Sequence, residues 1–344
     1  MERFESECPC KILFMKIAIV KLSAFGDIIH AMVVLQFIKK HNEEIEIDWI
    51  VEKSFKELLE NNPDINKIHV IDIRQAKMKK SICFLFNELR KVRRFGKYDL
   101  VIDMQGLIKS ALVARLIPST KTLGFDRPSS REGISSLFYD KTFKYAYNKN
   151  IIERNLAIIN FALGASYSID EIQDKLPFLF SNSNKLKSIF STSKKNILLI
   201  PGASVFSKRY APYKLAKLTT LIDADFHILW GSEDEKKIAK EIKAAAPDVN
   251  ICEKLSINSL ILLISQVDLV IGPDTGPTHM AWACNKPSIT LFGPTPGFRN
   301  SLVTNVNKII ESESEVNPFE IDNTDHSINN IEESDIANLA KNLL

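Results

Sequence analysis

The segment Gly272-Pro-Asp-Thr-Gly-Pro-Thr-His279 carries residues whose types and order suit the binding of phosphate. A strand-like apolar run precedes it and a helix-like run follows it, so the pattern predicts a strand, a tight loop and the start of a helix. Thr275 and Gly276 can present free backbone amides there, and Pro277 suits a first helical position, where no amide partner is needed. Such a helix start binds a diphosphate without a metal. A strand-to-helix turn that binds nothing fits the same pattern equally well.

The segment Lys21-Leu-Ser-Ala-Phe-Gly-Asp27 is a second place where a strand-like run ends and a helical pattern begins. Ligands of doubly wound α/β folds bind at the carboxyl ends of the strands, which puts Gly26 and Asp27 in a suitable position. Asp27 can cap the following helix, which is the commoner role of such a residue. It can also serve as a general base, and the segment by itself does not decide between the two roles.

Two further strand ends carry charged residues. Pro201-Gly-Ala-Ser-Val-Phe-Ser-Lys-Arg209 is a glycine-containing loop that ends in two cations, of which Lys208 can neutralise a diphosphate; a solvated Lys–Arg pair is the alternative. Trp230-Gly-Ser-Glu-Asp-Glu235 offers a carboxylate for ribose hydroxyls, or simply an acidic first helical turn. Neither the P-loop pattern nor GxGxxG occurs in the sequence, so neither a P-loop NTPase nor a standard dinucleotide site is indicated.

Asp223-Ala-Asp225 matches the DxD signature with which some glycosyltransferases hold a metal ion. The motif comes just before a strand-like run instead of after one, which is the wrong end of a parallel sheet for a ligand. We therefore predict a helix-to-strand turn at this position and no metal.

Residues 74–97 form a basic stretch with nine Lys or Arg residues and one Glu. The apolar block Ile82-Cys-Phe-Leu-Phe86 lies within it. This mixture predicts an amphipathic surface for an anionic, lipid-like partner or a membrane interface. Packing of a helix against the core is the competing explanation for the Phe residues, and a solvated face is the competing explanation for the charges.

The composition fits a protein of two domains in a reducing compartment. A chain of 344 residues exceeds the usual size of one domain, and five scattered cysteines, an odd number, argue against a disulfide framework. The net charge of +3 does not indicate a nucleic-acid partner. The sequence contains no apolar run of about 18 residues, so we predict no membrane-spanning helix. Residues 1–14 lack the apolar core of a secretory signal, and we expect them to be a disordered extension.

Strand-length apolar runs alternate with helical patterns along the chain, which predicts parallel, doubly wound sheets. The strand candidates are residues 17–20, 47–51, 68–71, 100–102, 122–124, 197–200, 226–230, 267–271 and 288–291. Helical patterns include residues 28–40, 215–222 and 331–344. A polar, Ser-, Asn- and Lys-rich stretch at 181–196 interrupts the alternation. We predict a linker there, between a first domain at 15–180 and a second at 197–344.

Taken together, these segments resemble the bacterial lipopolysaccharide heptosyltransferases, and most closely the type I enzymes. The matching pieces are MKIAIVKLSAFGDIIHA (15–31), DWIVE (48–52), DMQGLIKSALVARL (103–116), REGISSLFY (131–139), KRYAP (208–212), WGSEDE (230–235), DTGPTHMAWA (274–283) and PSITLFGPT (287–295). The pieces at 103–116 and 131–139 are fairly specific to type I, whereas the piece at 274–283 is shared across the family. Two departures exist: Pro201-Gly-Ala-Ser is more like the loop of type II enzymes, and Arg209-Tyr210 stands where a longer aromatic piece is common.

The resemblance implies a GT-B fold, with two Rossmann-like domains facing across a cleft and a final helix that packs back on the first domain. It implies an inverting, metal-independent and cofactor-free transfer of heptose from ADP-L-glycero-β-D-manno-heptose to the first Kdo of Kdo2-lipid A. The enzyme would be a cytoplasmic monomer, peripheral on the anionic inner face of the inner membrane.

Within that reaction, we assign the base role to Asp27 and the stabilisation of departing ADP to Lys208. The donor contacts are Gly26, Ser204, Lys208, Glu235, Asp274, Thr275, Gly276 and His279, and the acceptor contacts are Arg74, Lys77, Asp103, Gln105 and Arg131. A type II enzyme that adds a later heptose is the alternative. Two alternatives come from other classes. A nucleotide-sugar epimerase on the same fold would need no acceptor, and a catalytically inactive ADP-binding module would tolerate the loss of Asp27.

Overall fold

The computed structural model describes residues 15–183, 190 and 193–344. The chain forms two compact units, of which the first ends at Lys175 and the second begins at Leu176. The boundary therefore falls a few residues before the linker predicted at 181–196. The extension expected at 1–14, and part of that linker, lie outside the described residues.

The first unit is built on a six-stranded parallel sheet with the strand order β3-β2-β1-β4-β5-β6. Its strands are β1 (Lys16–Val20), β2 (Glu46–Glu52), β3 (Lys67–Ile71), β4 (Tyr98–Asp103), β5 (Ser119–Phe125) and β6 (Lys141–Phe143). This is the order of a Rossmann fold, in which the strand sequence reverses between β1 and β4. Residues 17–20 of β1 are all apolar and fully buried, as expected for a parallel strand covered on both faces.

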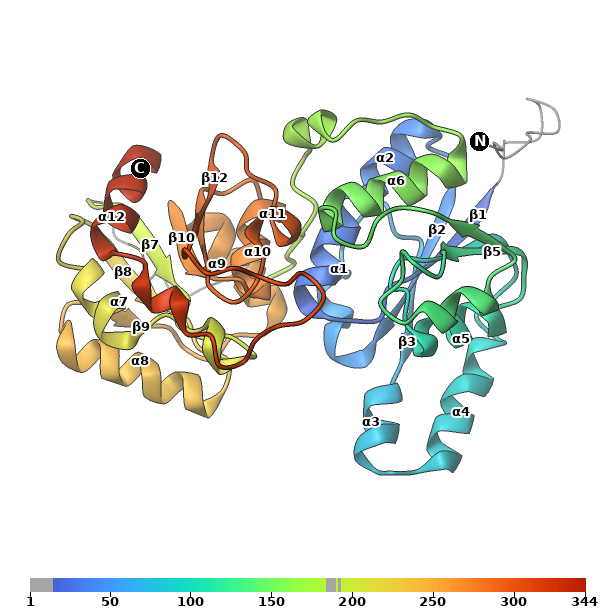
Figure 1. Ribbon diagram of the computed structural model, residues 1–344, viewed down its shortest axis with the longest axis horizontal. Helices are drawn as coiled ribbons and strands as arrows, with labels where there is room; N and C mark the ends of the chain where they lie inside the picture. The colour runs from blue at the N-terminus through green and yellow to red at the C-terminus, as the bar shows by residue number, and fades with distance from the viewer. Residues whose placement is uncertain (1–14, 184–189, 191–192) are drawn as a thin grey trace. The chain divides into compact units, whose positions relative to one another are not determined.

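The second unit repeats the same arrangement, with the order β12-β11-β10-β7-β8-β9 in a second parallel sheet (Figure 1). Its strands are β7 (Asn196–Leu199), β8 (Asp225–Ile228), β9 (Asn250–Ile251), β10 (Leu269–Pro273), β11 (Ser288–Phe292) and β12 (Asn307–Glu311). Here the reversal falls between β7 and β10. The predicted fold class, two doubly wound α/β domains of Rossmann type, is confirmed.

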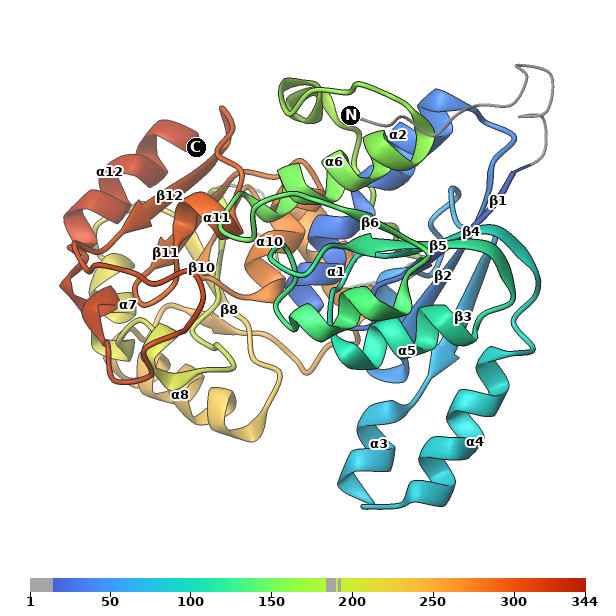
Figure 2. The same cartoon turned by 45° about the vertical axis from the view of Figure 1, so that its right-hand side comes forward.

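The helices of the first unit pack in two groups, which cover the two faces of its sheet (Figures 1 and 2). One group consists of α1 (Phe25–Met32), α2 (Val34–His41) and α6 (Ile151–Leu163), and the other of α3 (Ile73–Met78), α4 (Ile82–Val92) and α5 (Ile108–Leu116). The 3₁₀ turns of this unit are η2 (Lys53–Leu58), η3 (Gly133–Phe138) and η4 (Asp170–Asp174). The helical pattern at 28–40 thus corresponds to two helices, which are separated at Val33.

The second unit is likewise covered by two groups of helices, α7 with α8 and α12, and α9 with α10. Their bounds are α7 (Pro212–Leu218), α8 (Glu233–Ala245), α9 (Ile257–Gln266), α10 (Gly276–Ala283) and α12 (Glu333–Leu343). The short elements are α11 (Gly297–Asn300) and the 3₁₀ turns η5 (Phe206–Lys208) and η6 (Ser327–Asn330).

The final helix packs within the second unit, where α12 contacts α7 and β11. That it also packs back on the first domain stays a prediction. Its residues Ile336, Ala337 and Ala340 are buried in the apolar core of that unit. The spacing of these three residues gives the helix a single apolar face, and the core of its own unit takes up that face.

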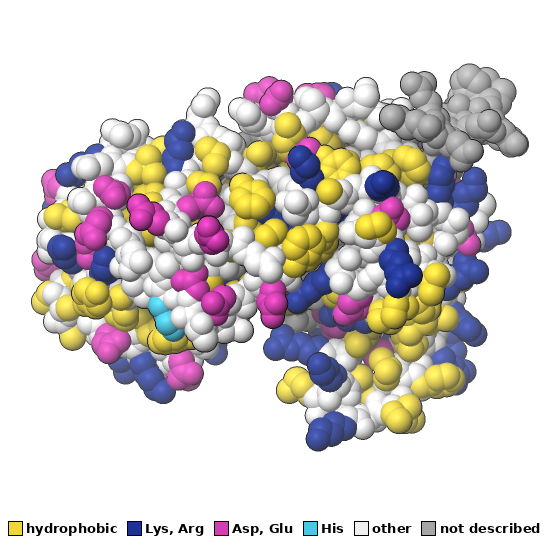
Figure 3. Space-filling model, in the orientation of Figure 1, with side chains coloured by type: hydrophobic (Ala, Val, Ile, Leu, Met, Phe, Trp, Pro, Cys, Tyr) yellow, Lys and Arg dark blue, Asp and Glu magenta, His cyan; other side chains and the backbone are white. Residues whose placement is uncertain are grey.

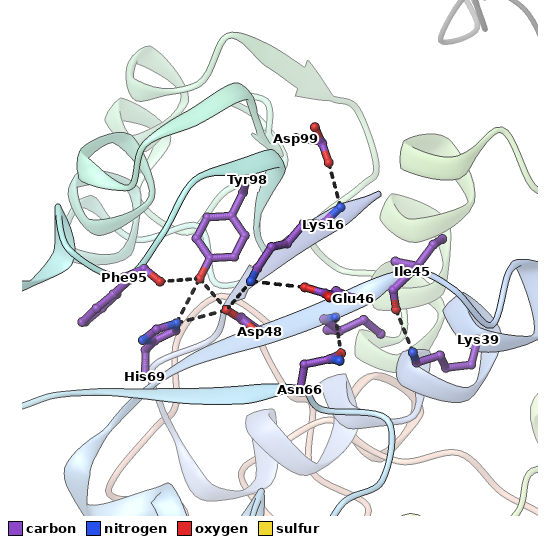
Figure 4. Close-up of polar contacts among 11 residues, drawn as sticks. Lys16, Lys39, Ile45, Glu46, Asp48, Asn66, His69, Phe95, Tyr98 and Asp99 are labelled. Carbon is purple, nitrogen blue, oxygen red and sulfur yellow. Dashed lines mark hydrogen bonds and ion pairs between the residues drawn. The ribbon is translucent and has the colours of Figure 1, made fainter. Parts of the chain in front are cut away.

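A buried polar network ties together the amino ends of the first four strands (Figure 4). Asp48 accepts a hydrogen bond from the Tyr98 hydroxyl at 2.6 Å and lies 3.2 Å from His69 Nε2 and 3.6 Å from Lys16 Nζ. Burial alone would raise the pKa of Asp48, but its partners outweigh burial and lower that pKa. The network lies at the edge opposite to the carboxyl ends of the strands, so we interpret it as structural.

No helix in the described part of the chain is long and apolar enough to cross a membrane.

Candidate active site

The carboxylate of Asp274 is the centre of a polar cluster at the carboxyl ends of β7 and β10, where the strand order of the second sheet reverses. Its Oδ2 lies 2.8 Å from Lys208 Nζ and its Oδ1 lies 2.8 Å from His279 Nε2. Thr295 and Asn300 donate to Oδ2 at 2.9 and 3.3 Å. The structure therefore brings together three of the predicted donor-site residues in one contact network.

Both members of the Lys208–Asp274 ion pair are largely removed from water, with 12% and 8% of their side chains exposed. Burial alone would raise the pKa of the Asp274 carboxyl. The charge of Lys208 and the hydrogen bond from His279 reverse that effect and hold the pKa far below its usual range. Asp274 is therefore a permanent anion at neutral pH, and it fixes Lys208 at the edge of the sheet.

The start of α10 offers the amides that the sequence predicted. Thr275 is the N-cap and Gly276 the first helical residue, so Pro277 lies one position later than expected. Within the described part of the chain, no residue accepts a hydrogen bond from the amides of Thr275 or Gly276. Two free amides at the positive end of a helix, beside a lysine, form a site for an anion.

The loop that follows β7 is also ordered around this cluster. Arg209 donates to the carbonyl of Ala203 at 3.0 Å, whereas Lys208 is paired with Asp274. The two cations are thus not the solvated pair of the alternative interpretation. Ser204 lies exposed in the same loop.

Glu235 has the capping role that the sequence allowed and leaves one oxygen for the ribose role, which stays a prediction. Its Oε2 accepts from the amides of Gly231 and Ser232 at 2.7 and 3.1 Å, so it caps α8 together with Ser232. Its Oε1 has no hydrogen-bond partner within the described part of the chain and lies against Gly202, where a Cβ would come within 2.2 Å. The glycine after β7 is therefore needed for Glu235 to approach the loop, and one carboxylate oxygen stays available to a ligand.

In the first unit, Asp27 lies in the first turn of α1, directly after the loop that follows β1, and next to the half-buried Gly26. Its Oδ2 accepts from the amide of Ala24 at 3.2 Å, so the capping role is present. The side chain is exposed, and Oδ1 has no partner among the residues described. The carboxylate can therefore cap the helix through one oxygen and accept a proton on the other.

The β1–α1 loop is clamped by Gln105, which follows β4. The side-chain carbonyl of Gln105 accepts from the amides of Leu22 and Ser23 at 2.8 and 3.3 Å, and its amide donates to Ser23 Oγ at 3.2 Å. Lys109 Nζ lies 3.1 Å from the same Ser23 hydroxyl. Gln105 was predicted as an acceptor contact, but its side-chain oxygen and nitrogen both form hydrogen bonds with the loop that precedes Asp27.

Asp103 was also predicted to contact the acceptor, and this is corrected by the structure. Its side chain is fully buried, and it accepts from Ser110 and Tyr139 at 2.7 Å and from the Gln105 amide at 2.8 Å. Burial raises the pKa of this carboxyl. Asp103 therefore fixes the backbone of Gln105 through a hydrogen bond, and its buried side chain is not accessible to a ligand.

The remaining predicted acceptor residues are exposed cations. Arg74 and Lys77 lie on α3, and Arg131 lies between β5 and η3. Lys109 and, in the second unit, Thr295 and Asn300 were not predicted from the sequence. Lys109 and Thr295 fall inside the quoted pieces at 103–116 and 287–295, so a signal existed for both. Asn300 had none.

The DxD motif lies where the sequence placed it, with Asp225 at the amino end of β8 and Asp223 paired with Lys194 at 2.6 Å. Within the described ranges, no group of three or more His, Cys, Asp or Glu side chains is arranged to hold a metal ion. Metal independence of the reaction remains a prediction.

The strand order of both units, with anion-binding groups at the carboxyl edge of the second, defines a two-domain α/β protein of the GT-B class. A solved structure of the E. coli heptosyltransferase WaaC with ADP has the same fold, with a TM-score of 0.79 over 96% of this chain and 100% of that one, at 21% sequence identity.

Residues 86–326 match the family model described as glycosyltransferase family 9 (heptosyltransferase). Lipopolysaccharide heptosyltransferase 1 of Campylobacter coli is 40% identical over 96% of this chain and 99% of its own length. The enzyme of the same name from Pseudomonas aeruginosa is 27% identical over 83% of this chain and 80% of its length. The chain therefore belongs to glycosyltransferase family 9, the heptosyltransferases of lipopolysaccharide biosynthesis.

Proposed function

We propose that this chain transfers L-glycero-D-manno-heptose from ADP-heptose to the first Kdo of Kdo2-lipid A, with inversion and without a metal ion. The observation that carries the proposal is the Lys208–Asp274 pair beside the free amides of Thr275 and Gly276. Its support from relatives is the 40% identity to a heptosyltransferase 1 over nearly the whole chain.

The donor is assigned to the second unit. The diphosphate accepts hydrogen bonds from the two amides at the start of α10 and from Lys208, which has N–H groups left after bonding Asp274. The free Oε1 of Glu235 accepts from a ribose hydroxyl. As the bond between the anomeric carbon and the diphosphate breaks, the electron pair stays on ADP, and Lys208 and the helix amides stabilise the added charge.

Asp27 of the first unit supplies the base. The acceptor hydroxyl attacks the anomeric carbon from the face opposite to ADP, which inverts that centre. Its proton passes to Oδ1 of Asp27, the oxygen that the helix cap leaves available. Lys109, together with Arg74, Lys77 and Arg131, supplies cations for the carboxylates and phosphates of the acceptor. Since Kdo2-lipid A is a membrane lipid, we place the enzyme at the cytoplasmic face of the inner membrane.

The proposal is tested by incubating the protein with ADP-heptose and Kdo2-lipid A and measuring the mass of the product by mass spectrometry. A product heavier by one heptose is expected. Asp27→Asn should keep ADP affinity within a few-fold while turnover falls by roughly 10²–10⁴-fold. Near-normal turnover by this variant would exclude the base role.

The same assay separates the alternatives. A type II enzyme would leave Kdo2-lipid A unchanged and extend an acceptor that already carries a heptose; the type II-like loop at 201–204 is the feature that favours it. An epimerase would turn over the donor without any acceptor, and a silent module would bind ADP and form no product.

A further inference from the structure

Helices α3 and α4 form a hairpin that extends away from the sheet of the first unit, as both ribbon views show (Figures 1 and 2). Each helix has a side-chain cap, with Asp72 accepting from the amide of Gln75 and Ser81 from that of Phe84. The two helices pack against each other, and α4 also packs against α5. The hairpin is therefore an ordered part of its unit, and its outer side is open.

The turn of this hairpin exposes three large apolar side chains. Met78, Ile82 and Phe86 have 77%, 85% and 61% of their surface exposed. Ile82 and Phe86 are four residues apart on α4 and so share one face. Helix packing explains Phe84, which is half-buried, but it does not explain these three. We call Met78, Ile82 and Phe86 the apolar tip.

Cations lie at the apolar tip and also farther along α4. Lys77, Lys79 and Lys80 lie at the turn itself, and Arg90, Lys91, Arg93 and Arg94 follow toward the end of α4; all are exposed. The Arg90 guanidinium lies 6.0 Å from the centre of the Phe86 ring. In the space-filling view, hydrophobic and Lys or Arg side chains gather over this hairpin (Figure 3).

The single acid of residues 74–97 faces inward. Glu88 is buried, accepts from the amide of Asp72 at 3.0 Å and pairs with Lys91. The outer side of the hairpin therefore carries no carboxylate from this stretch to offset its cations. An exposed apolar tip with cations beside it complements a surface that is anionic outside and apolar beneath.

We propose that the α3–α4 hairpin is the membrane-docking element of this protein: the apolar tip enters an anionic bilayer, and the cations beside it pair with lipid phosphates. This deepens the proposed function, because an enzyme whose acceptor is embedded in a bilayer must work at that surface. The cations give a salt-dependent contribution to binding, and the apolar tip gives a contribution that salt does not remove.

The first test measures binding of the whole protein to vesicles of equimolar phosphatidylethanolamine and phosphatidylglycerol. Each cation close to such a surface contributes a factor of about five, so Lys79→Gln, Lys80→Gln and Arg90→Gln together should weaken binding at least tenfold. Lys91 is left in place because it pairs with the buried Glu88. The matched control changes Lys237, Lys240 and Lys254 of the second unit, all exposed, to Gln, and should bind within twofold of the parent.

The second test addresses the apolar tip. Ile82→Gln with Phe86→Gln should weaken vesicle binding several-fold and abolish the part that survives high salt. The matched control is Phe319→Gln with Ile321→Gln, two exposed apolar residues of the second unit, and should leave binding unchanged. In a Phe86→Trp variant, lipids brominated in the acyl chain should quench the fluorescence of the new indole.

The proposal is overturned if the parent protein does not bind anionic vesicles, or if hairpin and control variants lose binding equally. It is also overturned if the hairpin variants bind vesicles normally but lose turnover on a soluble, deacylated acceptor, since the cations would then contact the acceptor. Absence of heptose transfer by a parent protein that still binds vesicles would contradict the proposed reaction alone.

Discussion

At the scale of single residues, the candidate site depends on one buried ion pair. The Lys208–Asp274 contact has a structural and a proposed functional role, because Asp274 needs a cation to remain ionised out of water and the ligand needs a cation at its phosphates. A single substitution cannot separate the two roles, since removing either partner leaves the other charge buried and unpaired.

A pair of substitutions can separate them. Asp274→Asn and Lys208→Met should each lower the free energy of unfolding by about 3–5 kcal/mol, the usual effect of breaking a buried pair. The double variant buries no charge and should regain most of this stability in denaturant unfolding. Its ADP affinity, measured by titration calorimetry, should nevertheless stay about 10-fold or more below that of the parent. Recovery of ADP affinity along with stability would remove Lys208 from the donor site.

The pH dependence of the same pair has a definite sign. The pKa of Asp274 is lower in the folded than in the unfolded chain, so the unfolded chain takes up the proton first as the pH falls. The stabilisation by the pair is complete above the ordinary carboxyl pKa of about 4 and shrinks below it. As the pH falls below about 4, the free energy of unfolding of the parent should therefore decrease relative to that of the double variant.

At the scale of elements, the loop between β1 and α1 is held by a neighbouring strand end. Gln105 bonds the backbone of Leu22 and Ser23, and the buried Asp103 holds Gln105 in turn. The position of Asp27 therefore depends on a residue that follows β4. This makes Gln105 a positioning residue for the proposed base.

Gln105→Ala should lower kcat by about 10- to 100-fold, the size of effect expected when a catalytic group is displaced by about an ångström. The KM for ADP-heptose should change little, because all the proposed donor groups except Gly26 lie in the other unit. Gln105→Glu keeps the accepting oxygens and should recover part of the loss, whereas Gln173→Ala, at an exposed position of the same unit, should have no effect. A rise in acceptor KM with unchanged kcat would return Gln105 to acceptor binding.

At the scale of the whole molecule, two units with the same strand order carry different groups at their carboxyl edges. The first presents a carboxylate and cations, and the second presents helix amides and a lysine held by Asp274. We propose that the reaction needs both, with the base from the first unit and leaving-group stabilisation from the second. Since Lys208 and the α10 amides can meet the charge of a diphosphate, we predict that the reaction needs no divalent cation.

Heptose transfer should accordingly persist in EDTA at the rate found without chelator. The control is Asp223→Asn with Asp225→Asn, which removes the DxD motif and should leave the rate unchanged. Loss of activity in EDTA that Mg²⁺ or Mn²⁺ restores would show that a metal takes part.

The main elements and most of the second-unit site could be predicted from local residue patterns. All nine predicted strands are present, because buried parallel strands are continuous apolar runs that stand out from their surroundings. Strands β6, β9 and β12 were missed, since they are short or interrupted by polar residues at or near sheet edges. The helix start at Thr275 and Gly276 could be read from local residue types, because capping and proline preferences act within a few residues.

Which polar groups are open to a ligand and which bond to each other became apparent from the folded chain alone. Asp103 and Gln105 lie at the carboxyl end of a strand, as Asp27 does. Asp103 is nevertheless fully buried, and Gln105 clamps a loop more than eighty residues away in sequence. The same holds for α12, whose apolar face fits a core but does not specify which core. Local sequence sets what a residue can do within its own turn or strand, whereas burial and pairing depend on segments that only folding brings together.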